Sequence, residues 1–243
     1  MAAAGKVMIG LTLTAPMRVW KQVRHIWAAL AARSRFALGY PAVMHTADRQ
    51  VLEQQILPAL VRDPAITRVL FVGCDWYTAH YERLLPGLTL HTLDHDPRRR
   101  RYGTARHHVA ALQDIEMLFP AGSLDVIVCN GVYGWGLDAL DDCERAFRAC
   151  AVCLRFEGSF VLGWNAVPAH DPAPLAQLSM AGFAPHVFSP IGTARLEVAG
   201  SIDRHHYAFY RRTDELVEAC AGGLESCKPG APPSEPCRRR AVR

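Results

Sequence analysis

Short, uninterrupted apolar segments recur through the middle of the chain, with more polar, helix-forming segments between them. A strand that is apolar at every position, rather than at alternate positions, is typical of a parallel sheet covered on both faces. The recurrence of strand and helix therefore predicts an α/β fold. The predicted strands are residues 68–72, 88–93, 107–109, 124–129, 159–164 and 206–210.

Helices are predicted at residues 45–62, 77–85, 97–102, 140–154 and 174–181. The length of 243 residues suits one domain, which we place at residues 48–221. Residues 1–47 are predicted to form a basic helical extension. Residues 222–243 are rich in Gly, Pro and Arg and are predicted to be a disordered tail.

The net charge of +4 is unevenly distributed. Six Lys or Arg and no acid precede Asp48, and residues 228–243 hold five Lys or Arg against Glu235, so the middle of the chain is acidic. This argues against nucleic acid as a partner of the folded core. Three interpretations of the basic N-terminal segment stay open: a helix that covers a cofactor pocket, a helix that makes peripheral contact with a membrane surface, or an organellar presequence.

The eight cysteines, without a recognisable signal peptide, predict reduced thiols and a cytoplasmic protein. Cys143, Cys150 and Cys153 recur at helical intervals on a predicted core face. Cys150 and Cys153 form a CxxC, but no second pair completes a zinc site, so no metal is expected.

The turn after the first predicted strand indicates the kind of ligand. Gly73 ends that strand and Asp94 follows about 20 residues later, a spacing at which an acid accepts hydrogen bonds from ribose hydroxyls. Asp75, Trp76 and Tyr77 would repel or block the diphosphate of NAD or FAD at this turn. S-adenosylmethionine lacks that diphosphate and carries an ammonium, so Asp75 favours it. Asp75 as a helix N-cap is the alternative.

Four stretches resemble class I S-adenosylmethionine-dependent methyltransferases, especially the small type 11 domain group. In order, over residues 67–165, they are VLFVGC, LHTLDHDP, FPAGSLDVIVCNGVYGWG and ERAFRACAVCLRFEGSFVLGWN. The resemblance implies a Rossmann-like, seven-stranded, mostly parallel sheet with helices on both faces. It also implies methyl transfer from S-adenosylmethionine to a small-molecule acceptor.

The resemblance also implies roles for individual residues. Gly73 would lie beside the methionine portion of the cofactor, Asp94 would hold the ribose, and Asp114 and Ile115 would frame the adenine. The family's second and third glycines are replaced by Asp75 and Tyr77. This departure leaves open a second interpretation, a methyltransferase-like binding module without activity.

Loops after the later strands are predicted to border the acceptor. Asn130 is predicted to bond the methionine end of the cofactor or to cap the chain. Tyr133 or Trp135 is predicted to stack on the acceptor or to face the sulfonium, or Trp135 packs under its loop. Asn165 is predicted to serve the site as well.

Methyl transfer from a sulfonium needs mainly alignment of the reacting atoms, so a general base is optional. His170, after Asn165, is the candidate base. The other histidines near the strands are expected to serve structure: His107, His108, His205 and His206. The sequence has no GxSxG, GxxxxGK[ST] or HExxH motif, which argues against hydrolases, phosphate-loop proteins and zinc proteases.

Overall fold

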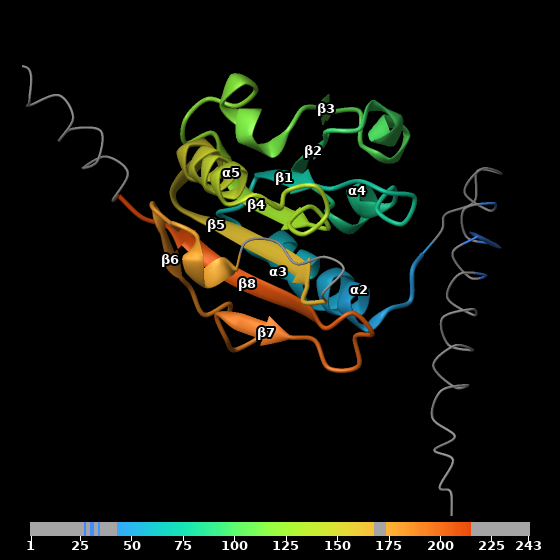
Figure 1. The fold of residues 1–243 in the computed structure, drawn as a ribbon. Helices are drawn as coiled ribbons and strands as arrows, with labels where there is room; N and C mark the ends of the chain where they lie inside the picture. Colours follow the sequence, from blue (N-terminus) through green and yellow to red (C-terminus); the bar gives the residue numbers. More distant parts are fainter. Residues whose placement is uncertain (1–26, 28–29, 32–33, 35–42, 168–173, 215–243) are drawn as a thin grey trace, which may run out of the picture.

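The structure is a computed structural model that describes residues 27, 30–31, 34, 43–167 and 174–214. One sheet of eight strands forms its centre, in the order β3-β2-β1-β4-β5-β8-β6, with β7 paired to β8 beside this path (Figure 1). The strands are β1 (Arg68–Val72), β2 (Thr89–Asp94), β3 (His107–Val109), β4 (Leu124–Asn130), β5 (Leu154–Asn165), β6 (Phe183–Pro185), β7 (Arg195–Glu197) and β8 (His205–Arg212).

Strands β1 to β5 pair in parallel, and β8 runs antiparallel to β5. The carboxyl ends of β1, β2, β4 and β5 therefore meet at one edge of the sheet, and β8 begins at that same edge. We call it the carboxyl edge. The predicted α/β class and mostly parallel sheet are confirmed. The sheet has one strand more than the seven that the resemblance implied, and the additional strand beside the main path is β7.

Helices cover both faces of the sheet, because each face is apolar along the strands. One face is covered by a continuous helical segment over residues 47–62: α2 (Ala47–Val51), the π-helical η1 (Leu52–Ile56) and α3 (Leu57–Arg62). The short α4 (Tyr81–Leu84) lies on the same face. The other face is covered by α5 (Leu140–Cys153) and the 3-10 helix η3 (Leu112–Met117). We call these two sides the α2 face and the α5 face.

The predicted core face of α5 is confirmed. Cys143, Cys150 and Cys153 are all fully buried against the sheet, together with Phe147. Burial raises the pKa of the Cys153 thiol to about 12. These cysteines therefore fill space in the core as neutral thiols.

Two predicted helices are shorter than expected. Residues 77–85 were predicted to be helical, but α4 begins only at Tyr81. A local turn precedes it, in which Asp75 N donates to Thr78 Oγ1 at 3.0 Å and Thr78 N donates to Asp75 O at 2.9 Å. Such local bonds compete with helix formation. The predicted helix 174–181 is reduced to a 3-10 turn, η4 (Leu175–Gln177), and the amide of Ser179 bonds Glu144 on α5 instead.

The 3-10 helix η2 (Pro97–Tyr102) lies where a helix was predicted, and the Asp96 side chain caps it. Within the described ranges, no helix has both the length and the apolar character needed to cross a membrane. The predicted N-terminal extension and C-terminal tail lie almost wholly outside the described residues.

Candidate functional site

Gly73 lies in close backbone contact with β4 at the carboxyl edge. It follows β1 with a φ of +92°, and a Cβ built there would lie 2.4 Å from the backbone oxygen of Asn130 at the end of β4. Only glycine satisfies both conditions, since side chains are disfavoured at positive φ and the neighbouring atom is backbone. The first loop is thus pressed against the end of β4.

Asp94 ties the loops after β1 and β2 together. Its Oδ2 accepts a hydrogen bond from Cys74 N at 2.8 Å, and its Oδ1 accepts one from Asp96 N at 2.9 Å. A carboxylate has about four lone-pair positions, so Asp94 retains acceptor capacity for a ligand. Its side chain is 12% exposed, which leaves it in reach of one.

Asp75 is not the free carboxylate that the sequence interpretation assumed. Its side chain forms an ion pair with Arg99 of η2, and Arg99 also donates to Cys74 O at 3.3 Å. The positive charge of Arg99 neutralises the negative charge of Asp75. A preference of the protein for a ligand with a cationic tail therefore cannot rest on Asp75. The N-cap alternative is wrong too, because Asp75 Oδ1 bonds the amide of the next residue, Trp76, and α4 begins later.

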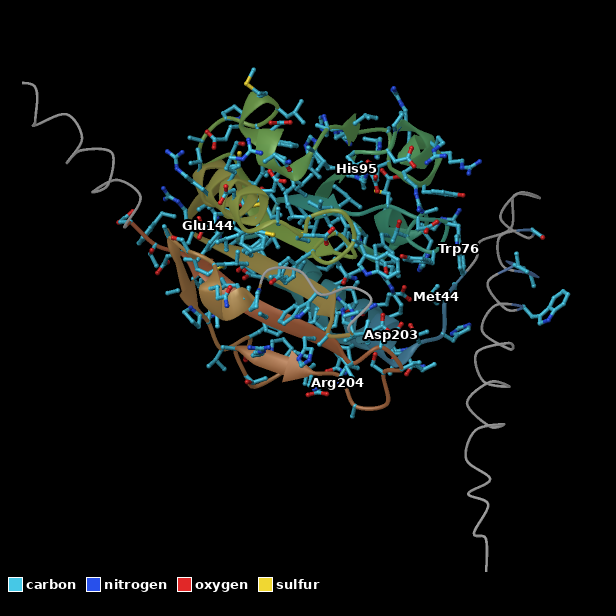
Figure 2. The ribbon with its side chains drawn as sticks, in the orientation of Figure 1. Met44, Trp76, His95, Glu144, Asp203 and Arg204 are labelled. Atoms are coloured by element: carbon cyan, nitrogen blue, oxygen red, sulfur yellow. The ribbon has the colours of Figure 1, made fainter. Side chains whose placement is uncertain are left out.

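Trp76 packs away from solvent in a small cluster with Cys74 and Tyr102. Burial raises the pKa of the Cys74 thiol to about 12, so it is not a nucleophile at neutral pH. Figure 2 shows Trp76 and Met44, which precedes α2, on the same side of the molecule as Asp203, which precedes β8. The loop after β1 and the approaches to α2 and β8 therefore share one side.

Asn130 presents a buried amide at the carboxyl edge. The residue is 2% exposed, and neither Oδ1 nor Nδ2 has a hydrogen-bond partner among the described residues. Gly163, its register partner on β5, makes room for it, because a Cβ there would lie 2.2 Å from Asn130 Oδ1. An unpaired buried amide is costly, so this one is suited to a ligand.

Arg49 is a candidate site residue that the sequence analysis missed. It lies on α2 with 6% exposure, donates from Nη1 to Tyr81 Oη at 3.1 Å, and stacks 4.3 Å from the centre of the Tyr77 ring. Its Nε has no hydrogen-bond partner in the described ranges and lies 3.6 Å from Asp48 Oδ2. The available signal was an arginine within an apolar helix face, because a buried charge needs partners.

The loop after β4 divides its two aromatic residues. Tyr133 is 1% exposed and packs edge-on against Trp164 and near Phe147, so its ring lies in the core of the α5 face. Trp135 is 49% exposed, so its side chain is not packed under the loop. An acceptor contact by Trp135 stays a prediction.

Asn165 ends β5 and is paired in register with His205 at the start of β8. Asn165 Oδ1 lies 2.6 Å from His205 Nδ1. Burial lowers the pKa of His205 to about 4, so the ring is neutral at neutral pH. The neighbouring His206 points to the α5 face and stacks on Trp164.

Solved structures share this arrangement of elements. N-methyltransferase NodS from Bradyrhizobium japonicum, solved with S-adenosyl-L-homocysteine, is 17% identical with a TM-score of 0.51 over 70% of this chain and 90% of its own. A TehB-like SAM-dependent methyltransferase from Corynebacterium glutamicum is 17% identical with a TM-score of 0.51, over 79% of this chain and all of its own. The chain has the class I methyltransferase fold.

No protein-family profile matches the sequence, and a search of curated proteins found no relative. The methyltransferase fold is therefore identified by comparison with solved structures and not by sequence similarity. The expected mostly parallel sheet agrees with it.

Within the methyltransferase fold, the predicted adenine pair is misplaced in part. Ile115 is fully buried in the core of the α5 face, whereas Asp114 is exposed on η3, so the two side chains do not lie together as a pair. The residues that directly follow β3 are Ala110 and Ala111, and Ala110 N donates to Asp94 O at 3.2 Å. His170, the candidate base, lies outside the described residues.

Proposed function

We propose that this protein transfers a methyl group from S-adenosylmethionine to a small-molecule acceptor. The proposal rests on the residues that meet at the carboxyl edge. They are Gly73, the hydrogen-bond acceptor Asp94, and Asn130, whose amide has no partner among the described residues. The fold likeness to a methyltransferase solved with S-adenosyl-L-homocysteine supports the same cofactor.

The residues present fit that cofactor. Asp94 would accept the hydrogen bonds of ribose hydroxyls, Asn130 would bond the methionine portion, and the guanidinium of Arg49 would pair with the methionine carboxylate. Gly73 lets the first loop approach the end of β4 closely, which brings this loop beside Asn130. When bound, the cofactor supplies an electrophilic methyl group on a sulfonium.

Titration calorimetry with S-adenosylmethionine, S-adenosylhomocysteine and NAD tests the proposal. We expect the first two to bind and NAD not to bind. Asp94→Ala should weaken binding at least tenfold, because the ribose loses its acceptor. Arg145→Ala is the control, since Arg145 lies on the exposed side of α5 and pairs only with Asp142 among the described residues. Binding of NAD alone would overturn the proposal.

Transfer is tested separately from binding. The full chain is incubated with methyl-labelled cofactor and an extract of its host, and labelled small molecules are separated and identified. Cofactor binding without any labelled product would favour the inactive binding module instead.

A further inference from the structure

A row of polar side chains lies on the α2 face at the carboxyl edge. Asn165 and His205 are register partners on β5 and β8, so their side chains leave the sheet on the same face. Tyr207 is two residues from His205, lies on that face, and donates from its hydroxyl to Asp48 O on α2 at 3.1 Å. The row therefore lies beneath the first turn of α2.

Contacts on several sides fix the ring of His205. Its Nδ1 lies 2.6 Å from Asn165 Oδ1, its backbone amide donates to Ser201 Oγ at 3.1 Å, and its ring meets Tyr207 edge-on at 4.7 Å. An amide oxygen has no hydrogen to donate, so Nδ1 carries the hydrogen. The lone pair of His205 is therefore on Nε2.

That lone pair has no partner among the described residues. His205 is 4% exposed, and Nε2 is buried without a hydrogen bond to any described residue. The same side of the sheet holds other buried polar atoms in this condition, namely Thr46 Oγ1, Arg49 Nε and both amide atoms of Asn130. Buried polar groups are normally satisfied. Unpaired buried atoms also occur elsewhere in the described residues, such as Ser123 Oγ and Thr213 Oγ1. Those on this face lie on the side of Asn130 and Arg49, where a polar ligand would satisfy them.

The position relative to the cofactor residues follows from the register. Asn130 pairs with Gly163, Gly163 pairs with Tyr207, and Asn165 and His205 lie two residues further out on the same face. His205 is thus two strands from Asn130, roughly 10 Å across the sheet. A small acceptor spans that distance.

We propose that His205, oriented by Asn165, is the catalytic base that receives the proton of a hydroxyl group on the methyl acceptor. This inference rests on the proposed function. The hydroxyl oxygen forms a bond to the methyl carbon while the carbon–sulfur bond breaks and its electron pair goes to sulfur. The hydroxyl proton moves to Nε2, and the imidazolium then releases it to water.

The chemistry selects a hydroxyl over an amine. Burial keeps the pKa of His205 low, at about 4, so its lone pair is present at neutral pH but weakly basic. The oxygen of a hydroxyl gains positive charge as it is methylated and gives up its proton readily, even to a weak base. An alkylammonium, whose pKa is about 10, does not.

Nitrogen-15 NMR of the full chain with labelled histidine tests the proposal without turnover. The protein is saturated with S-adenosylhomocysteine and titrated with phenol, and with butylamine as the amine control. We expect hydrogen on Nδ1 of His205 and an Nε2 resonance that moves with phenol only. Hydrogen on Nε2, or an Nε2 resonance that phenol leaves unchanged, overturns the proposal. Failure to bind S-adenosylhomocysteine instead overturns the proposed function.

Variants test the role in turnover, with labelled cofactor and host extract as the acceptor source. His205→Gln should lower the rate at least about 100-fold while cofactor affinity stays within about twofold. His206→Gln is the matched control, because His206 lies on the same strand but faces Trp164; its rate should be unchanged. A wild-type rate in His205→Gln overturns the proposal.

Asn165→Asp tests the role of Asn165 in positioning the ring. It also provides an independent test of His205 if the His205→Gln variant does not fold. A carboxylate at this position stabilises the imidazolium, so the acid limb of the kcat profile should move to higher pH by about one to two units. The other groups that act on His205 are Asp48, which raises its pKa, and Arg49 and His206, which lower it. These are the same in both proteins, and an unmoved limb overturns the role of His205.

Discussion

At the scale of single residues, close approach and buried charge decide what this site can bind. Gly73 touches the end of β4, Asp94 joins two loops, and Asp75 is neutralised by Arg99. The cofactor roles of Gly73 and Asp94 stay predictions. The sequence interpretation of Asp75 did not include Arg99, because this partner comes from η2, more than twenty residues away in the chain.

Gly73→Ala should lower the free energy of unfolding by about 2–4 kcal/mol, because the new Cβ meets the Asn130 carbonyl at a positive φ. Gly87→Ala is the matched control. Gly87 has a similar φ of +81° but no described atom within 4 Å of the built Cβ, so its cost should be about 1 kcal/mol. Urea unfolding of both variants measures the difference, and equal losses would contradict the packing argument.

His205 makes stability depend on pH. Its pKa is lowered from 6.5 to about 4 by burial, so between these values the unfolded chain binds a proton that the folded chain does not. Stability is therefore full above pH 6.5 and falls as the pH drops toward 4, by about 3 kcal/mol from this group. His205→Gln should flatten that part of the urea-unfolding profile, and an unchanged slope would show that the ring titrates normally.

At the scale of elements, the two edges of the sheet have different tasks. The carboxyl edge holds the buried amide of Asn130 and the buried ring of His205, whereas a bonded carboxylate joins three strands at the amino edge. Asp125 at the start of β4 accepts from Thr67 N and Arg68 N, both at 2.8 Å, and from Arg155 Nε at 2.8 Å. Burial opposes its charge, but these bonds hold the pKa of Asp125 below its usual value.

Asp125→Asn should therefore cost about 2 kcal/mol in urea unfolding, because charge-assisted bonds that join β1, β4 and β5 are weakened. Cofactor affinity, measured by calorimetry, should stay within about twofold, since the change lies at the opposite edge of the sheet. A large loss of affinity at unchanged stability would contradict this division between the edges.

At the scale of the whole molecule, cofactor binding and folding are linked. At a concentration 100 times its Kd, S-adenosylhomocysteine should stabilise the protein by about 2.7 kcal/mol. For a domain of this size that corresponds to a rise in Tm of roughly 5–10 °C. Thermal unfolding measures it, with NAD at the same concentration as the control that leaves Tm unchanged.

The sequence by itself determined the strands β1 to β5 and the helix α5 with its buried cysteines, and it predicted the edge at which we propose the site. Those features depend on local apolar patterns and on the rule that parallel strands expose their carboxyl ends to ligands. The three-residue strands β6 and β7 carried too little pattern to be predicted.

Only the tertiary structure decided which polar groups are paired. Arg99 reaches Asp75, Arg49 enters from α2, and Asn165 meets His205 across forty residues of sequence. Such pairs depend on how distant elements pack, and periodicity along one segment contains no information about them. For the same reason His205 was expected to serve structure, although its unpaired nitrogen makes it the candidate base.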